Sequence, residues 1–132
     1  MPQPDHVIAF PTPDPADVTE ADIRKYFDKC MEKIGFVPNV LQAYSFKPDR
    51  WRAFVTYYHA VMDKGTSALS PLEREMIAVV VSSVNRCYYC LVAHGAAVRQ
   101  LSDDPELGEM LVMNYRVAPL SERQRAMLTS PG

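Results

Sequence analysis

The sequence predicts an all-α fold, and two observations carry this prediction. Apolar residues recur every three or four positions in each long segment of the 132-residue chain, which is the spacing of one face of an α-helix. No run of alternating polar and apolar residues is long enough to predict a β-strand. The length suits one domain, and a hydrophobic content of 48% with 23% charged residues is typical of a globular protein.

Two parts of the chain are expected. Residues 1–16 contain five prolines and are predicted to form an extended arm. Residues 17–132 are predicted to form a single helical domain.

The first helix is predicted at about 17–34, where one apolar stripe is followed by Gly35, a residue type that commonly ends helices. Thr19 with Asp22 three residues later resembles a capping box in which Asp replaces Glu. A short helical piece is expected to follow, up to about Phe46.

Pro48 is predicted to open the next helix, because proline suits the first helical position, and Gly65 is expected to end it. The face of this helix that is expected to be buried comprises Trp51, Phe54, Val55, Tyr58, Val61 and Met62.

Ser70–Glu73 is the clearest helix start in the sequence. Ser70 can cap the helix, Pro71 occupies its first position, and Glu73 completes a capping box. This helix is expected to be buried almost all round. It is predicted to end between about Ser83 and Asn85, because asparagine tolerates the left-handed backbone conformation in which helices often end.

Three further helices are expected in the rest of the chain. The first begins at about Cys87 and continues past Val98, a weaker one spans 105–114, and the last begins at Ser121 and runs to the end of the chain at Gly132.

Charge and hydropathy exclude several classes of function. Sixteen acidic and fourteen basic residues give a net charge of -2, and no basic stripe is present, so no nucleic-acid partner is expected. The N-terminus lacks the pattern of a signal peptide, and the longest apolar run, Met76–Val81, is far too short to span a membrane. The chain is therefore expected to be cytoplasmic, with no membrane partner.

The three cysteines indicate redox or metal chemistry, because two of them are only three residues apart and the expected compartment is reducing. On a helix that begins at Cys87, Cys90 lies about 60° and His94 about 20° around the axis from Cys87. All three side chains are therefore expected on one face. Cys87 also falls in the first turn, where the helix dipole favours a thiolate.

Glu75 is expected to lie beside His94. If the two helices that flank Asn85 fold back as a hairpin, Glu75 lies about 15 Å back from the turn and His94 about 12 Å forward of it. A carboxylate at that level can hold the imidazole in one tautomer, so that the imidazole takes a proton from a cysteine.

These residues together resemble a known family signature. Glu75, eleven intervening residues, Cys87-Tyr88-Tyr89-Cys90, three more residues and His94 resemble the motif of the alkyl hydroperoxidase D-like proteins. These proteins belong to the carboxymuconolactone decarboxylase-like superfamily, and the resemblance is strongest to the branch usually labelled peroxidase-related. It extends from about Gly35–Asn39 through Leu69–Glu75 to Tyr115–Leu120.

The resemblance implies a helical bundle that assembles as a homo-oligomer, either a trimer or a hexamer. It implies a peroxiredoxin-type activity on hydroperoxides in which Cys90 attacks the peroxide, Cys87 resolves the product as a disulfide, and Glu75 with His94 forms the proton relay. No bound cofactor is implied, since electrons come from an external dithiol reductant. In the founding members that reductant is a lipoylated protein, and a lipoyl-type partner is therefore one expectation here.

Two departures from the family pattern are visible. The founding enzymes have a histidine at the position of Tyr89, so one element of their proton relay is absent or is replaced by a phenol. Relatives in the peroxidase-related branch usually continue beyond the position of Gly132, so the chain is expected to be either a member with a bundle shortened at its C-terminus or a fragment.

The residues also leave structural alternatives open. Cys87 and Cys90 can be buried small side chains, as Cys30 on the apolar stripe of the first helix is expected to be. A zinc site with His94 and Glu75 as further ligands is the sharper rival, but structural zinc sites usually place the Cys-x-x-Cys pair on a turn, so no metal is predicted.

Two functional alternatives also remain. One is a thiol–disulfide exchange or redox-sensing module without peroxidase turnover, and the other is a catalytically silent subunit of an oligomer. Covalent haem is excluded, because Leu91 stands where the haem-attachment motif needs histidine.

Overall fold

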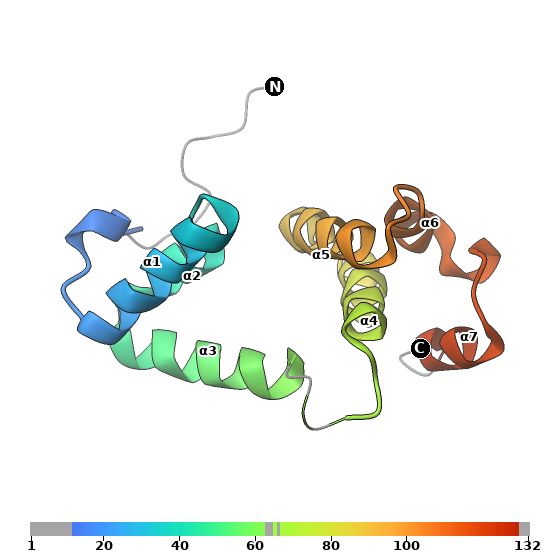
Figure 1. Cartoon of the computed structure of the whole chain (residues 1–132), viewed down its shortest axis with the longest axis horizontal. Coiled ribbons are helices and arrows are strands. Elements are labelled where there is room, and N and C mark those ends of the chain that lie inside the picture. Colours follow the sequence, from blue (N-terminus) through green and yellow to red (C-terminus); the bar gives the residue numbers. More distant parts are fainter. Residues whose placement is uncertain (1–11, 63–64, 66, 130–132) are drawn as a thin grey trace. The chain divides into compact units, whose positions relative to one another are not determined.

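The computed structural model describes residues 12–62, 65 and 67–129 (Figure 1). This part of the chain contains seven α-helices, two 3-10 helices and no strand, which confirms the predicted all-α class. The chain divides into two compact units, Met1–Val61 and Met62–Gly132, which are described separately below. The single domain expected over 17–132 includes residues of both units and stays a prediction.

The first unit contains η1 (Pro15–Asp17), α1 (Ala21–Ile34), α2 (Asn39–Tyr44) and most of α3 (Pro48–Met62). Most of the predicted N-terminal arm lies outside the described residues. Its described end is not fully extended, since Pro15 opens η1 and the Asp14 side chain accepts a hydrogen bond from the backbone of Ala16.

Helix α1 ends as predicted but begins differently. Gly35 has a φ of 79°, the left-handed conformation that favours glycine, and its N–H binds the carbonyl of Met31. The predicted capping box of Thr19 and Asp22 is wrong, because Glu20 occupies the N-cap position without a side-chain cap. Asp22 is instead held by Arg52 of α3, whose Nε lies 2.8 Å from Oδ2 of Asp22.

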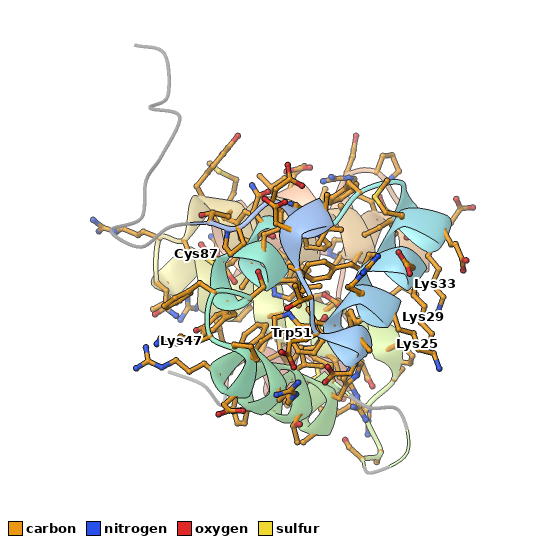
Figure 2. The ribbon with its side chains drawn as sticks, turned by 90° about the vertical axis from the view of Figure 1, so that its left-hand side faces the viewer. Lys25, Lys29, Lys33, Lys47, Trp51 and Cys87 are labelled. Atoms are coloured by element: carbon orange, nitrogen blue, oxygen red, sulfur yellow. A yellow bond between two sulfur atoms is a disulfide. The ribbon has the colours of Figure 1, made fainter. Side chains whose placement is uncertain are left out.

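The core of the first unit forms around Trp51, which is only 4% exposed and packs edge-on against Tyr26 and Phe27 of α1. Figure 2 shows Trp51 among the helices of this unit, while the lysines of α1 project from its outer edge. These lysines, spaced four residues apart on an exposed row, are Lys25, Lys29 and Lys33.

The predicted buried face of α3 is only partly buried. Phe54 and Val55 pack against the core around Trp51, but Tyr58 and Val61 are 39% and 53% exposed. The apolar stripe of α3 therefore continues beyond the stretch that the core of the first unit covers. The predicted end of the helix at Gly65 follows residues outside the described part, and α3 is described up to Met62.

The second unit contains α4 (Pro71–Val84), α5 (Tyr88–Ser102), α6 (Leu107–Asn114), η2 (Tyr115–Val117) and α7 (Glu122–Thr129). The buried side chains at its core come from four of these helices and from Ala118. They are Met76, Val79, Val80, Val98, Leu107, Leu111, Ala118 and Leu128. Helices α4 and α5 make the most extensive contact, as the arms of a hairpin, and α6 packs against both.

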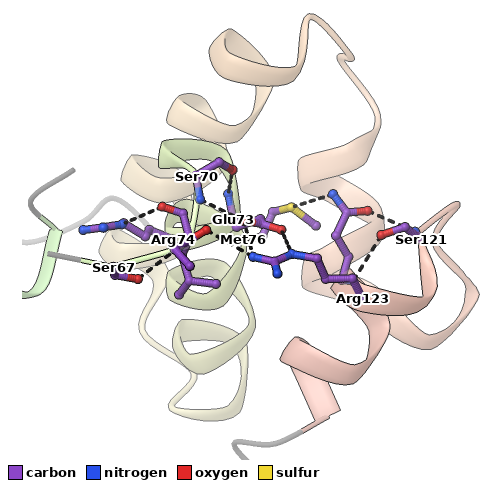
Figure 3. Close-up of polar contacts among 10 residues, drawn as sticks. Ser67, Ser70, Glu73, Arg74, Met76, Ser121 and Arg123 are labelled. Atoms are coloured by element: carbon purple, nitrogen blue, oxygen red, sulfur yellow. Dashed lines mark hydrogen bonds and ion pairs between the residues drawn. The ribbon is translucent and has the colours of Figure 1, made fainter. Parts of the chain in front are cut away.

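The start of α4 matches the prediction in each hydrogen bond. The N–H of Glu73 donates to Oγ of Ser70 at 3.1 Å, and the N–H of Ser70 donates to Oε2 of Glu73 at 2.8 Å (Figure 3). The Glu73 carboxylate also receives Nε of Arg123 on α7 at 3.0 Å. The capping box thus ties the first turn of α4 to the last described helix.

Helix α4 ends at Val84, within the range predicted for its end, but Asn85 is not the residue in the left-handed conformation. Asn85 keeps right-handed helical angles, and Arg86 takes the left-handed conformation with a φ of 53°. The N–H groups of Arg86 and Cys87 bind the carbonyls of Ser83 and Ser82, which is the hydrogen-bond pattern of a Schellman motif. The preference of asparagine for the left-handed conformation therefore did not decide which residue adopts it.

The remaining predicted helices are present with shifted starts. Helix α6 begins at Leu107 rather than 105, and α7 begins one residue after Ser121. The predicted end of α7 at Gly132 lies outside the described residues. No helix in the described part is long and apolar enough to cross a membrane.

Candidate redox site

Cys87 and Cys90 lie at the start of α5 and are joined by a disulfide, with their Cα atoms 5.3 Å apart. Cys87 is the N-cap residue rather than a residue of the first turn, and its Sγ accepts the backbone N–H of Cys90 at 3.4 Å. Both side chains are half-buried. The N–H of Cys90 and the dipole of α5 therefore act on the sulfur of Cys87.

Glu75 and His94 meet across the hairpin. Oε2 of Glu75 lies 2.7 Å from Nδ1 of His94, and the two side chains are 14% and 25% exposed. The helical rise predicted that the two residues stand level, and this geometry is confirmed. An ionised carboxylate can only accept a hydrogen bond, so Nδ1 carries the hydrogen and Nε2 of a neutral imidazole keeps its lone pair.

The hairpin thus brings all four sequence-predicted site residues into one unit of the structure. Glu75 lies on α4, while Cys87, Cys90 and His94 lie at the start and in the first two turns of α5. Cys90 and His94 are one helical turn apart, which places their side chains on the same face of α5. The arrangement combines a disulfide-forming pair with a carboxylate-oriented imidazole.

The tyrosines between the cysteines face outward. Tyr88 is 78% exposed and Tyr89 is 43% exposed. Tyr89 therefore lies at the surface, between the two cysteines in the sequence, and is not part of the core.

Among the described residues, no group of three or more His, Cys, Asp or Glu side chains is arranged to hold a metal ion. The zinc alternative required both cysteine sulfurs as ligands, and these sulfurs are bonded to each other here.

The third cysteine belongs to the first unit. Cys30 is half-buried on α1 and packs against the core there, and burial raises the pKa of its thiol. A raised pKa lowers the thiolate fraction, so Cys30 has the character of a packing residue, as expected.

Motif spacing does not single out Arg86, the residue directly before Cys87. What distinguishes Arg86 in the sequence is that no other Lys, Arg, Asp or Glu lies between Glu75 and Arg99. The structure adds that its side chain is exposed.

The sequence from residue 48 to residue 129 matches the model of the carboxymuconolactone decarboxylase family. The chain belongs to this family. The matched region runs from the start of α3 to the end of α7 and includes Glu75, Cys87, Cys90 and His94. No curated protein matches this family member significantly.

Two solved structures are similar to this carboxymuconolactone decarboxylase family member over nearly all of its length. An uncharacterized peroxidase-related protein from Silicibacter sp. TM1040 is 60% identical, with a TM-score of 0.87 over 98% of this chain and 67% of that one. An alkylhydroperoxidase AhpD core, an uncharacterized peroxidase-related protein from Ralstonia eutropha JMP134, is 42% identical. Its TM-score is 0.85 over 91% of this chain and 62% of that one. The chain thus spans about two-thirds of the length of each relative.

Proposed function

We propose that this family member is a thiol-dependent peroxidase of the alkyl hydroperoxidase D-like type, which reduces hydroperoxides through a dithiol–disulfide cycle of Cys87 and Cys90. The observation that carries the proposal is the disulfide at the start of α5, together with the Glu75–His94 pair on the same hairpin. The peroxidase-related names of the two similar structures agree with it.

The first chemical step is assigned to Cys90. Nε2 of His94, whose tautomer is fixed by Glu75, accepts the thiol proton of Cys90. The Cys90 thiolate then attacks one peroxide oxygen, so that an S–O bond forms and the O–O bond breaks. The leaving alkoxide takes the proton from His94. The products are an alcohol and a sulfenic acid on Cys90.

The second step is assigned to Cys87. Its thiolate is favoured at the N-cap by the N–H of Cys90 and by the dipole of α5. The thiolate attacks the sulfur of the sulfenic acid and displaces water once the hydroxyl is protonated, which leaves the Cys87–Cys90 disulfide. An external dithiol then returns the pair to its reduced form by thiol–disulfide exchange.

The partners in this cycle follow from the same proposal. The substrate is a hydroperoxide, the reductant is an external dithiol or a lipoyl-type protein, and the chain itself carries no cofactor. The working unit is a homo-oligomer, a trimer or a hexamer, in the cytoplasm, where cellular thiol systems supply reducing equivalents.

The test starts from the fully reduced protein treated with one equivalent of hydrogen peroxide, followed by intact mass measurement with and without alkylation. The expected result is the loss of two hydrogens and of two alkylation sites, which map to Cys87 and Cys90. Steady-state peroxide consumption with a dithiol donor is then compared among the wild type, Cys90→Ser and Cys30→Ser.

Cys90→Ser is expected to abolish consumption, while Cys30→Ser, the matched cysteine control, keeps the wild-type rate. Full activity of Cys90→Ser would contradict the assignment. A disulfide that forms once but does not turn over with any dithiol would instead identify a redox-sensing or exchange module. Three thiols that remain alkylated would indicate a silent subunit.

A further inference from the structure

Arg86 occupies a backbone position that does not suit arginine. Its φ of 53° is the left-handed conformation, which costs a residue with a Cβ more than it costs glycine or asparagine. The chain has an asparagine immediately before it, at Asn85, but that residue keeps right-handed angles. The structure therefore places a long charged side chain at a strained position directly before Cys87.

The charge of Arg86 is also isolated. It is the only Lys, Arg, Asp or Glu between Glu75 and Arg99, the stretch that forms the hairpin and carries the cysteine pair. The carboxylate of Glu75 is already bound to His94. Within the described part of the chain, the exposed guanidinium of Arg86 makes no hydrogen bond or ion pair to another side chain.

We propose that Arg86 is a specificity residue for the reductive half of the cycle, where it binds a carboxylate on the dithiol that reduces the Cys87–Cys90 disulfide. This inference rests on the proposed redox cycle and adds the chemical class of the reductant. A guanidinium presents a planar fork of donors that matches a carboxylate and is always charged, so it suits this role better than a neutral residue.

The step that Arg86 favours is an ordinary thiol–disulfide exchange. One thiolate of the donor attacks a sulfur of the pair, which forms a mixed disulfide and releases the other cysteine as a thiolate that takes a proton. The second donor thiol attacks the mixed disulfide and releases the remaining cysteine. The donor leaves as a cyclic disulfide, so two electrons and two protons have passed to Cys87 and Cys90.

The expected effect is modest, because Arg86 is exposed to water. A pair of opposite charges about 5 Å apart in bulk water changes a rate or an affinity roughly fourfold. The effect should also depend on salt, since the screening length falls to about 3 Å at 1 M ionic strength.

The experiment measures the single-turnover reduction of the oxidised full-length chain, followed by alkylation of the released thiols. Two donors with the same dithiol are compared. Dihydrolipoate carries a carboxylate, and dihydrolipoamide carries a neutral amide in its place. The variants are Arg86→Asn, which removes the charge and suits the left-handed position, and Arg86→Lys, which keeps the charge.

The wild type is expected to react several-fold faster with dihydrolipoate at low salt, and this ratio should approach one at 1 M salt. Arg86→Asn should lower the ratio to about one without lowering the melting temperature, while Arg86→Lys should keep part of it. A wild-type ratio near one, or the same ratio in Arg86→Asn as in the wild type, would overturn the inference.

The assay contains no peroxide, so it separates the two proposals. A charge-dependent ratio in a protein that does not consume peroxide would support the role of Arg86 and contradict the peroxidase. A protein that consumes peroxide, but whose disulfide is reduced at the same rate by both donors, would support the peroxidase and contradict the role of Arg86.

Discussion

Oε2 of Glu75 lies 2.7 Å from Nδ1 of His94, so a carboxylate of α4 and an imidazole of α5 form one unit across the hairpin. Both side chains are partly buried, which limits the access of water to the contact. The contact fixes the ring of His94 and leaves Nε2 as the free basic atom of the pair. The same contact fixes how far α4 and α5 are shifted along each other near the cysteines.

Glu75→Gln is predicted to slow peroxide consumption at least about tenfold, because the amide keeps the shape of the side chain but loses the charge that stabilises a protonated imidazole. The measurement is the steady-state rate with a dithiol donor, together with the melting temperature to check folding. Glu32→Gln, an exposed glutamate on α1, is the matched control and should keep the wild-type rate. A folded Glu75→Gln variant with full activity would remove Glu75 from the relay.

Ser70→Ala is predicted to destabilise the chain by about 1 kcal/mol, because the N–H of Glu73 then loses its side-chain cap at the start of α4. For a chain of this size the melting temperature should fall by roughly 3–5 °C, measured by circular dichroism. Ser67→Ala is the control, since the Ser67 hydroxyl accepts the N–H of Leu69 in an exposed turn. Equal shifts for the two variants would mean that the capping box adds nothing beyond an ordinary turn.

Glu73 is predicted to make the stability of the chain depend on acid pH. The hydrogen bond from Arg123, together with the N–H of Ser70, holds the pKa of Glu73 below its ordinary value of 4.5. A carboxyl whose pKa is lowered by folding stabilises the folded state above its ordinary pKa, and this contribution is lost as the pH falls through the lowered value.

The measurement is the melting temperature of the wild type and of Glu73→Gln between pH 7 and pH 3. The wild type should be more stable at neutral pH, and the difference should shrink below about pH 4.5. Glu122→Gln, an exposed glutamate of α7, should show no such convergence. A difference between wild type and Glu73→Gln that stays constant across this range would exclude the ionised carboxylate as its source.

Features fixed by local chemistry or by regular helical geometry could be predicted from the sequence. The capping box of Ser70 and Glu73 involves neighbours in the chain, so its residue types suffice to identify it. To predict the contact of Glu75 with His94, only the helical rise and the position of the turn between the two helices were needed.

Features that depend on distant residues or on a single-residue shift could not be predicted. Asp22 was expected to complete a capping box with Thr19, but its partner is Arg52, thirty positions away in the sequence. The choice of Arg86 over Asn85 for the left-handed position depends on where the last turn of α4 closes. Hydrophobic periodicity identified the face of α3 that carries Tyr58 but not how far the core covers that face.

The position of α5 also depends on a close contact with α6. A Cβ added to Gly108 of α6 would lie 3.1 Å from the backbone oxygen of Gly95 on α5, which is tighter than most Cβ contacts and requires a small displacement of that backbone. A Cβ added to Gly95 would meet only Nη1 of Arg99 at 3.6 Å, the end of a flexible side chain. The close approach of the two helices therefore depends on the missing side chain of Gly108 more than on that of Gly95.

Gly108→Ala is therefore predicted to destabilise the chain by about 1–3 kcal/mol, because overpacking exceeds the gain in helix propensity. Gly95→Ala is the matched control and should be neutral or stabilising by up to about 1 kcal/mol, since alanine favours the helix and has room. Denaturant unfolding of both variants measures the difference. If Gly108→Ala proves as stable as Gly95→Ala, then α5 and α6 approach each other less closely than this geometry requires, and the hairpin that carries Glu75 and His94 does not depend on α6 for its position.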